Sequence, residues 1–263
     1  MKRLLVLIAA LVMMMCVTGA HAKVLNKAVP YQHDGVELEG YLAYDDAIEG
    51  KRPAVLLVHE WWGLNDYARR RAEQLAAMGY VAFAVDMYGK GKVTTHPKEA
   101  GEWAKQINSN LPLWQQRVSA GLEVLKKDPR VDVNRIAAIG YCFGGATVQQ
   151  LAYSGAELKG VVSFHGSLVP PTDEQSKQAK ARILICHGAA DPLITQEALQ
   201  NYLAAMGKSS LDWLIVIYGG AKHSFTNTDA DKTGMEALAY DKLADQRSWA
   251  HMKSFFDEIF KGR

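Results

Sequence analysis

Three residue types in this chain could together form a nucleophilic catalytic group. Cys142 lies in GYCFGG (140–145), Asp191 in GAADPL (188–193) and His223 in AKHSF (221–225). In such a group the histidine takes the thiol proton and the carboxylate fixes the histidine tautomer, so that sulfur can attack an electrophilic carbon. The order nucleophile, acid, histidine along the chain is a known one for such triads. The sequence therefore predicts Cys142 as a nucleophile served by His223 and Asp191.

The glycines around Cys142 predict the turn that would present it. Gly140, Cys142 and Gly144 have the G-x-C-x-G spacing of a nucleophile elbow, a sharp strand-to-helix turn that usually carries serine. This pattern is specific only in combination with the acid and the histidine, because glycines flank many structural turns.

A disulfide between Cys142 and Cys186 is the alternative reading of the cysteine. In the predicted topology the strand at 160–166 lies between the strands that carry the two cysteines. Two strand spacings are about 9–10 Å, whereas a disulfide needs Cα atoms within about 7 Å. Cys186 also lies inside an apolar run, where a free thiol packs as a small hydrophobic side chain. We therefore expect Cys186 to be structural.

Buried strands that alternate with helices would position these residues. The apolar runs at 54–60, 80–86, 135–141, 160–166, 182–188 and 212–220 predict strands, and an alternating pattern at 36–42 predicts an antiparallel one. Helical patterns separate them, and the last is expected over 237–260; residues 167–180 are expected to form a surface loop. This alternation predicts an α/β fold, a doubly wound and mostly parallel sheet with helices on both faces. Functional residues then belong at the carboxyl ends of the strands.

The end of the first buried strand, HEWWG (59–63), carries further candidates. The backbone N–H groups of Trp61 and Phe143 are expected to form an oxyanion hole, because they follow this strand and the nucleophile. Glu60 would lie beside two tryptophans in a cleft, and such burial should raise its pKa. Glu60 could then hold or accept the thiol proton, or it could be an ordinary loop glutamate.

The N-terminal residues have the pattern of an export signal. Lys2 and Arg3 precede an apolar run, and Ala20-His21-Ala22 has the small-x-small form of a cleavage site. We expect a signal peptide over 1–22, one domain over 23–263, and a periplasmic or secreted protein; a buried N-terminal helix is the alternative. Removal of Lys2 and Arg3 takes the net charge from +2 to zero. A neutral chain without a basic run predicts neither a nucleic-acid nor a membrane partner.

Taken together, the motifs resemble those of the dienelactone hydrolases, the cysteine-dependent branch of the α/β-hydrolases. The resemblance covers nearly the whole chain after about Val36 and rests on HEWWG, DMYG (86–89), GYCFGG, GAADPL and AKHSF. It implies the α/β-hydrolase fold and hydrolysis of a small ester or lactone through an acyl-cysteine. It also implies that Glu60 pairs with the resting thiol. We expect no cofactor or metal, because the sequence has no H-x-x-x-H or carboxylate cluster with metal-site spacing and no phosphate loop. We expect a monomer or small homo-oligomer.

Two positions depart from the family pattern. The resemblance implies two arginines that grip a substrate carboxylate, but this chain has Lys90 after DMYG and Asn227 after HSF. Lysine lacks the planar fork of arginine and asparagine lacks the charge. Lys90, Asn227 and the retained Ser224 are the candidate substrate-binding residues. A non-catalytic ligand-binding protein on the same scaffold is the alternative function.

Overall fold

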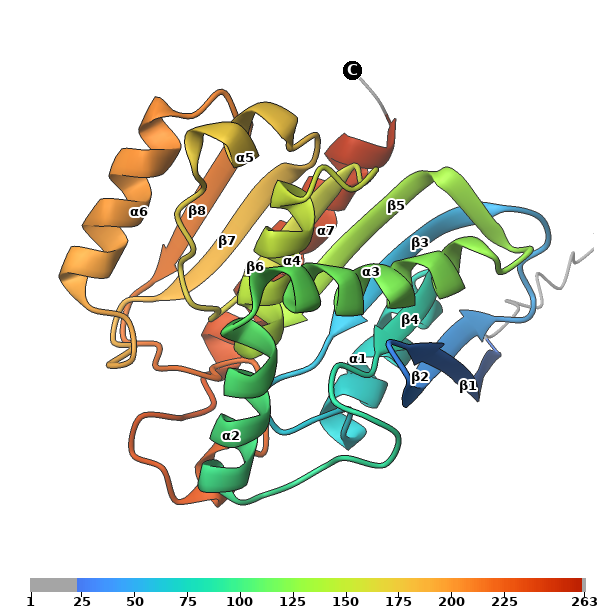
Figure 1. Ribbon diagram of the computed structural model, residues 1–263, viewed down its shortest axis with the longest axis horizontal. Helices are drawn as coiled ribbons and strands as arrows, with labels where there is room; N and C mark the ends of the chain where they lie inside the picture. Colours follow the sequence, from blue (N-terminus) through green and yellow to red (C-terminus); the bar gives the residue numbers. More distant parts are fainter. Residues whose placement is uncertain (1–22, 262–263) are drawn as a thin grey trace, which may run out of the picture.

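The computed structural model describes residues 23–261, and one eight-stranded sheet forms its centre (Figure 1). The strand order is β1-β2-β4-β3-β5-β6-β7-β8, and all pairs from β4 to β8 are parallel. The strands are β1 (Val24–His33), β2 (Val36–Asp45), β3 (Arg52–Val58), β4 (Val81–Val85), β5 (Val131–Tyr141), β6 (Gly160–Phe164), β7 (Arg182–Gly188) and β8 (Trp213–Tyr218). The predicted doubly wound, mostly parallel sheet is confirmed.

Helices cover both faces of the sheet (Figure 1). They are α1 (Asp66–Ala77), α2 (Pro97–Asn108), α3 (Leu111–Lys126), α4 (Phe143–Tyr153), α5 (Asp173–Gln178), α6 (Gln196–Lys208) and α7 (Lys242–Lys261). Side chains of α3, α4 and α6 pack in one apolar core, and those of α1 and α7 pack in a second core on the other face. Strand β3 contributes side chains to both cores, since Leu56 packs in the first core and Leu57 in the second. Burial on both faces explains its uninterrupted apolar sequence.

The first hairpin contains a strand that the sequence analysis did not predict. β1 pairs with β2 in antiparallel register over ten residues. Asp34 and Gly35 join the two strands with φ of 51° and 70°. Two positive φ values are the requirement of a type I′ turn, for which Asp-Gly is a favoured pair. The Asp-Gly pair was thus an available signal for this hairpin.

Two predictions about secondary structure were wrong: the surface loop over 167–180 and the start of the last helix at 237. Residues 167–180 contain α5, which begins with a capping box formed by Thr172 and Gln175. The last helix begins at Lys242 rather than at 237. The segment before it pairs with the loop that carries His223, because the N–H groups of Ala239 and Asp241 donate to His223 O and Phe225 O. Residues before Lys242 therefore form tertiary hydrogen bonds in place of a first turn of α7. These hydrogen bonds hold the loop that carries His223 in place.

Within residues 23–261, no helix is both long and apolar enough to span a bilayer. The predicted signal peptide lies outside the described residues.

Candidate active site

Cys142 lies at a strained turn between β5 and α4. Its φ is 54° and its ψ is −114°, a combination that L-residues rarely adopt outside functional turns. The Cys142 N–H donates to Phe164 O at 3.0 Å, which fixes the turn to the neighbouring strand. A Cβ on Gly140 would lie 2.0 Å from Gly144 O, so no larger residue fits there. A Cβ on Gly144 would likewise lie 2.2 Å from Val58 O. These contacts give the physical reason for both glycines of the elbow.

Asp191 and His223 lie together at the carboxyl ends of β7 and β8. His223 Nδ1 donates to Asp191 Oδ2 at 2.7 Å, and the Leu193 N–H holds the other carboxylate oxygen at 2.9 Å. Both side chains are buried. The bond to Asp191 orients the imidazole so that Nε2 is the free ring nitrogen. Nε2 is buried and lacks a well-formed hydrogen bond to any residue in 23–261.

The thiol of Cys142 interacts with this histidine. Burial by itself would lower the pKa of His223, but the charge of Cys142 and the hydrogen bond with Asp191 raise it to about 10. A neighbouring negative charge favours the protonated ring. Cys142 and Asp191 therefore favour the protonated, imidazolium form of His223.

Glu60 is buried and points to two of the predicted substrate-binding residues. Ser224 Oγ donates to Glu60 Oε1 and Asn227 Nδ2 donates to Glu60 Oε2, both at 2.7 Å. Burial raises the pKa of Glu60, although these two hydrogen bonds and nearby His223 act to lower it. Ser224 and Asn227 are thus partners of Glu60 in this structure.

The two predicted oxyanion donors have free N–H groups. Neither the Trp61 N–H nor the Phe143 N–H donates a hydrogen bond to a residue in 23–261. Phe143 is the first residue of α4, where backbone N–H groups have no helical acceptor. Both groups could therefore serve a substrate oxygen.

Lys90 lies against the β1–β2 hairpin. Its side chain is 56% exposed and pairs with Glu39 of β2 at 3.3 Å. It lines a hollow with residues of the β1–β2 hairpin, among them Tyr31 and Glu37.

A buried polar network behind the histidine loop was missed in the sequence. Thr226 Oγ1 bonds with Tyr67 at 2.6 Å and with His165 at 2.7 Å, and the Thr226 carbonyl accepts from Arg71 at 2.7 Å. The His165 ring also packs edge-on against His223, with centroids 5.4 Å apart. These residues come from α1, the end of β6 and the histidine loop, so no local pattern links them. The network fixes the loop that carries His223 and Asn227.

Other strand-end groups have structural roles. Asp86 accepts hydrogen bonds from the N–H groups of Glu39, Tyr88 and Gly89, as expected for a carboxylate that braces the turn after β4. Cys142 and Cys186 are both free, and Cys186 is fully buried in β7. The predicted structural role of Cys186 is confirmed. Among residues 23–261, no three His, Cys, Asp or Glu side chains gather as a metal site.

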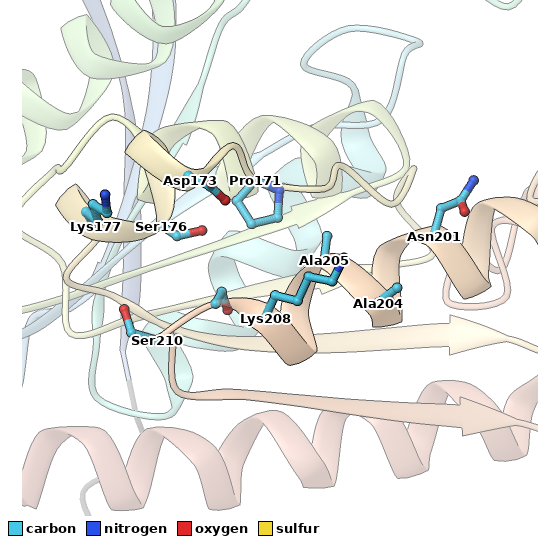
Figure 2. Close-up of a pocket in the computed structure, with 10 residues that line it drawn as sticks. Pro171, Asp173, Ser176, Lys177, Asn201, Ala204, Ala205, Lys208 and Ser210 are labelled. Atoms are coloured by element: carbon cyan, nitrogen blue, oxygen red, sulfur yellow. The ribbon is translucent and has the colours of Figure 1, made fainter.

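A surface groove of about 650 Å³ lies elsewhere, between α5 and α6 (Figure 2). Lys177 of α5 and Lys208 of α6 are among its lining residues, and none of the lining residues belongs to the predicted triad.

The fold and the strand-end residues define an α/β-hydrolase. The model of the dienelactone hydrolase family matches residues 38–260, and the chain therefore belongs to that family. A putative carboxymethylenebutenolidase of Saccharolobus solfataricus is 27% identical, over 90% of this chain and all of the relative.

Two solved structures are more similar in sequence. One is P91, a dienelactone hydrolase-like promiscuous phosphotriesterase from metagenomic libraries, at 36% identity and a TM-score of 0.87. The other, m3DLH, is 38% identical with the same TM-score. Each match covers 90% of this chain and 99% of the other. These relationships confirm the prediction of a hydrolase that acts on ester bonds.

Proposed function

We propose that this protein hydrolyses a small ester or lactone through an acyl-cysteine intermediate on Cys142. The observation that carries the proposal is the His223–Asp191 hydrogen bond, which leaves the other ring nitrogen, Nε2, to interact with the Cys142 thiol. The sulfur attacks the carbonyl carbon while His223 holds the proton. His223 then delivers that proton to the leaving oxygen, and the C–O bond breaks.

Water completes the cycle. His223 accepts a proton from a water molecule that attacks the thioester carbonyl, and the C–S bond then breaks. The free N–H groups of Trp61 and Phe143 stabilise the negative oxygen in both steps. Burial of Glu60 and its raised pKa support the further proposal, from family resemblance, that this carboxyl exchanges a proton with the resting thiol.

We also propose that the protein is exported, on the strength of the N-terminal pattern. Its substrate would then be met outside the cytoplasm.

The covalent step is tested by mass spectrometry after incubation with p-nitrophenyl acetate. We expect one acetyl group, located on Cys142, and no adduct or turnover in Cys142→Ala. Cys186→Ala is the matched control, because it removes a thiol that is buried in β7; it should still be acetylated once. Ester turnover that persists in Cys142→Ala would overturn the proposal. An intact thiol in the native protein would favour the non-catalytic binding protein.

A further inference from the structure

Tyr88 places an unpaired hydroxyl in the interior beside the active site. The residue is 5% exposed, and its hydroxyl oxygen is buried without a hydrogen-bond partner among residues 23–261. A buried hydroxyl without a partner costs free energy and requires an explanation.

The ring of Tyr88 is fixed by its neighbours. It packs edge-on against His59, with ring centroids 5.0 Å apart. It also contacts the tilted rings of Phe143 and Trp103, at centroid distances of 5.5 and 5.7 Å. The backbone before the ring is fixed as well, because Asp86 Oδ1 accepts from the Tyr88 N–H at 2.9 Å. The hydroxyl is therefore presented by a rigid side chain.

Two other tyrosines, Tyr141 and Tyr202, also have buried hydroxyls without a partner in the described part of the chain. Tyr88 differs from them because Cys142 is one of the groups that raise its pKa. Burial raises the pKa of Tyr88 far above its usual value, and Cys142 and then Asp86 raise it further. For Tyr141 and Tyr202 the corresponding influences do not include Cys142. The Tyr88 ring also contacts Phe143, the residue that follows the nucleophile, and its hydroxyl forms no hydrogen bond with Cys142.

The strand order places Tyr88 on the same side of Cys142 as Trp61, the predicted oxyanion donor. β4, which leads to Tyr88, lies next to β3, and β3 lies next to β5 with Cys142 at its end. β3 leads to Trp61, the predicted oxyanion donor. His223 and Asp191 follow β8 and β7 on the opposite side of β5. A carbonyl attacked by Cys142 would have its leaving group toward His223 and its oxygen toward the side where Tyr88 lies.

We propose that the Tyr88 hydroxyl is a third oxyanion donor, which acts together with the N–H groups of Trp61 and Phe143. The inference rests on the proposed ester hydrolysis. When the C–S bond forms, the carbonyl π electrons move onto oxygen, and the Tyr88 O–H donates a hydrogen bond to that oxygen while keeping its proton. The un-ionised phenol remains a donor throughout, and the substrate oxygen provides the partner that it otherwise lacks.

Tyr88→Phe tests the proposal, because it removes the hydroxyl and keeps the packed ring. We expect acylation by p-nitrophenyl acetate to slow by about a hundredfold to a thousandfold, the range for loss of one oxyanion donor. Alkylation of Cys142 by iodoacetamide should keep the native rate, since attack at a saturated carbon forms no oxyanion. The thermal midpoint should stay equal or rise, because an unpaired buried hydroxyl is removed.

Tyr202→Phe is the control, since it removes an equally buried hydroxyl in α6; its acylation rate should equal that of the native protein. Native-rate acylation in Tyr88→Phe would overturn the proposal. Parallel loss of acylation and alkylation would also overturn it, because the hydroxyl would then act on the thiol. If the native protein itself is not acylated, the proposed ester hydrolysis fails, and this inference fails with it.

Discussion

At the scale of single residues, burial and neighbouring charges together set the protonation of the histidines around Cys142. His223 is buried, yet its pKa is raised to about 10, since Cys142 and Asp191 outweigh the effect of burial. His165, only 5.4 Å away between ring centroids, has no such partner. Burial, then His223 and Arg71, hold its pKa well below the usual value. One histidine is therefore charged and its neighbour is neutral.

The neutral His165 predicts a pH-dependent contribution to stability. Below the unfolded pKa of 6.5 the unfolded chain binds a proton that the folded chain rejects, so the contribution of His165 to folding is lost as the pH falls. The loss begins near pH 6.5 and grows by up to about 1.4 kcal/mol per pH unit for as long as the folded chain stays unprotonated at His165. His165→Asn has no such titration, and asparagine tolerates the φ of 40° at this position.

We expect His165→Asn to be destabilised at pH 7 and to approach the native free energy of unfolding at pH 5. Urea unfolding at the two pH values measures the difference in free energy of unfolding between the variant and the native protein, which should be smaller at pH 5. His96→Asn, at an exposed position before α2, should show an equal difference at both values. A gap for His165→Asn that does not change with pH would contradict a neutral His165.

At the scale of elements, the turn from β5 to α4 stores strain. Cys142 has φ 54° and ψ −114°, whereas its neighbours continue a strand and a helix. The hydrogen bond to Phe164 O and the close crossing at Gly140 and Gly144 hold the residue in this conformation. The strain exposes the side chain above the sheet, where the triad can assemble.

This strain predicts that glycine is the more stable substitution at position 142. Neither Cys142→Gly nor Cys142→Ala has a thiol, so their comparison isolates the backbone. We expect Cys142→Gly to exceed Cys142→Ala in free energy of unfolding by about 1–3 kcal/mol.

The same pair of substitutions at Glu102, an exposed position in α2, is the control. There alanine should be more stable by about 1 kcal/mol. If chemical unfolding shows the alanine variant to be more stable than the glycine variant at both positions, the elbow is not strained.

At the scale of the whole molecule, the chain combines a hydrolase domain with the pattern of an export signal. The described structure has two unpaired cysteines, of which only Cys142 is partly exposed. In an oxidising compartment, an exposed thiol without a disulfide partner is open to oxidation. If the protein is exported as proposed, the free nucleophilic thiol of Cys142 is therefore exposed to oxidation.

The export proposal predicts a mature chain that begins at Lys23. Intact mass after expression in a bacterium should correspond to residues 23–263, in the periplasmic fraction or the medium. Leu7→Arg interrupts the apolar run and should leave the full-length chain in the cells. A native chain that keeps residues 1–22 in the cytosolic fraction would contradict the prediction.

Much of the fold and the triad candidates followed from local patterns in the sequence. Apolar runs such as 54–60 and 182–188 predict strands because each must be buried on both faces. Cys142, Asp191 and His223 each follow such a run, and parallel strands bring their carboxyl ends to one edge. The start of the last helix at Lys242 was not predictable in this way, because hydrogen bonds to His223 and Phe225 override local helical preference.

The sequence by itself determined the class of fold and which residues could do chemistry, since both depend on residue type and spacing. Only the tertiary structure decided which of these candidate residues bind to one another. Glu60 is bound by Ser224 and Asn227, which lie 164 and 167 residues away along the chain. Tyr88 contacts Phe143, the residue after Cys142, because only β3 lies between β4 and β5 in the sheet. Such contacts depend on how the sheet orders its strands, and the loops that follow them meet only after folding.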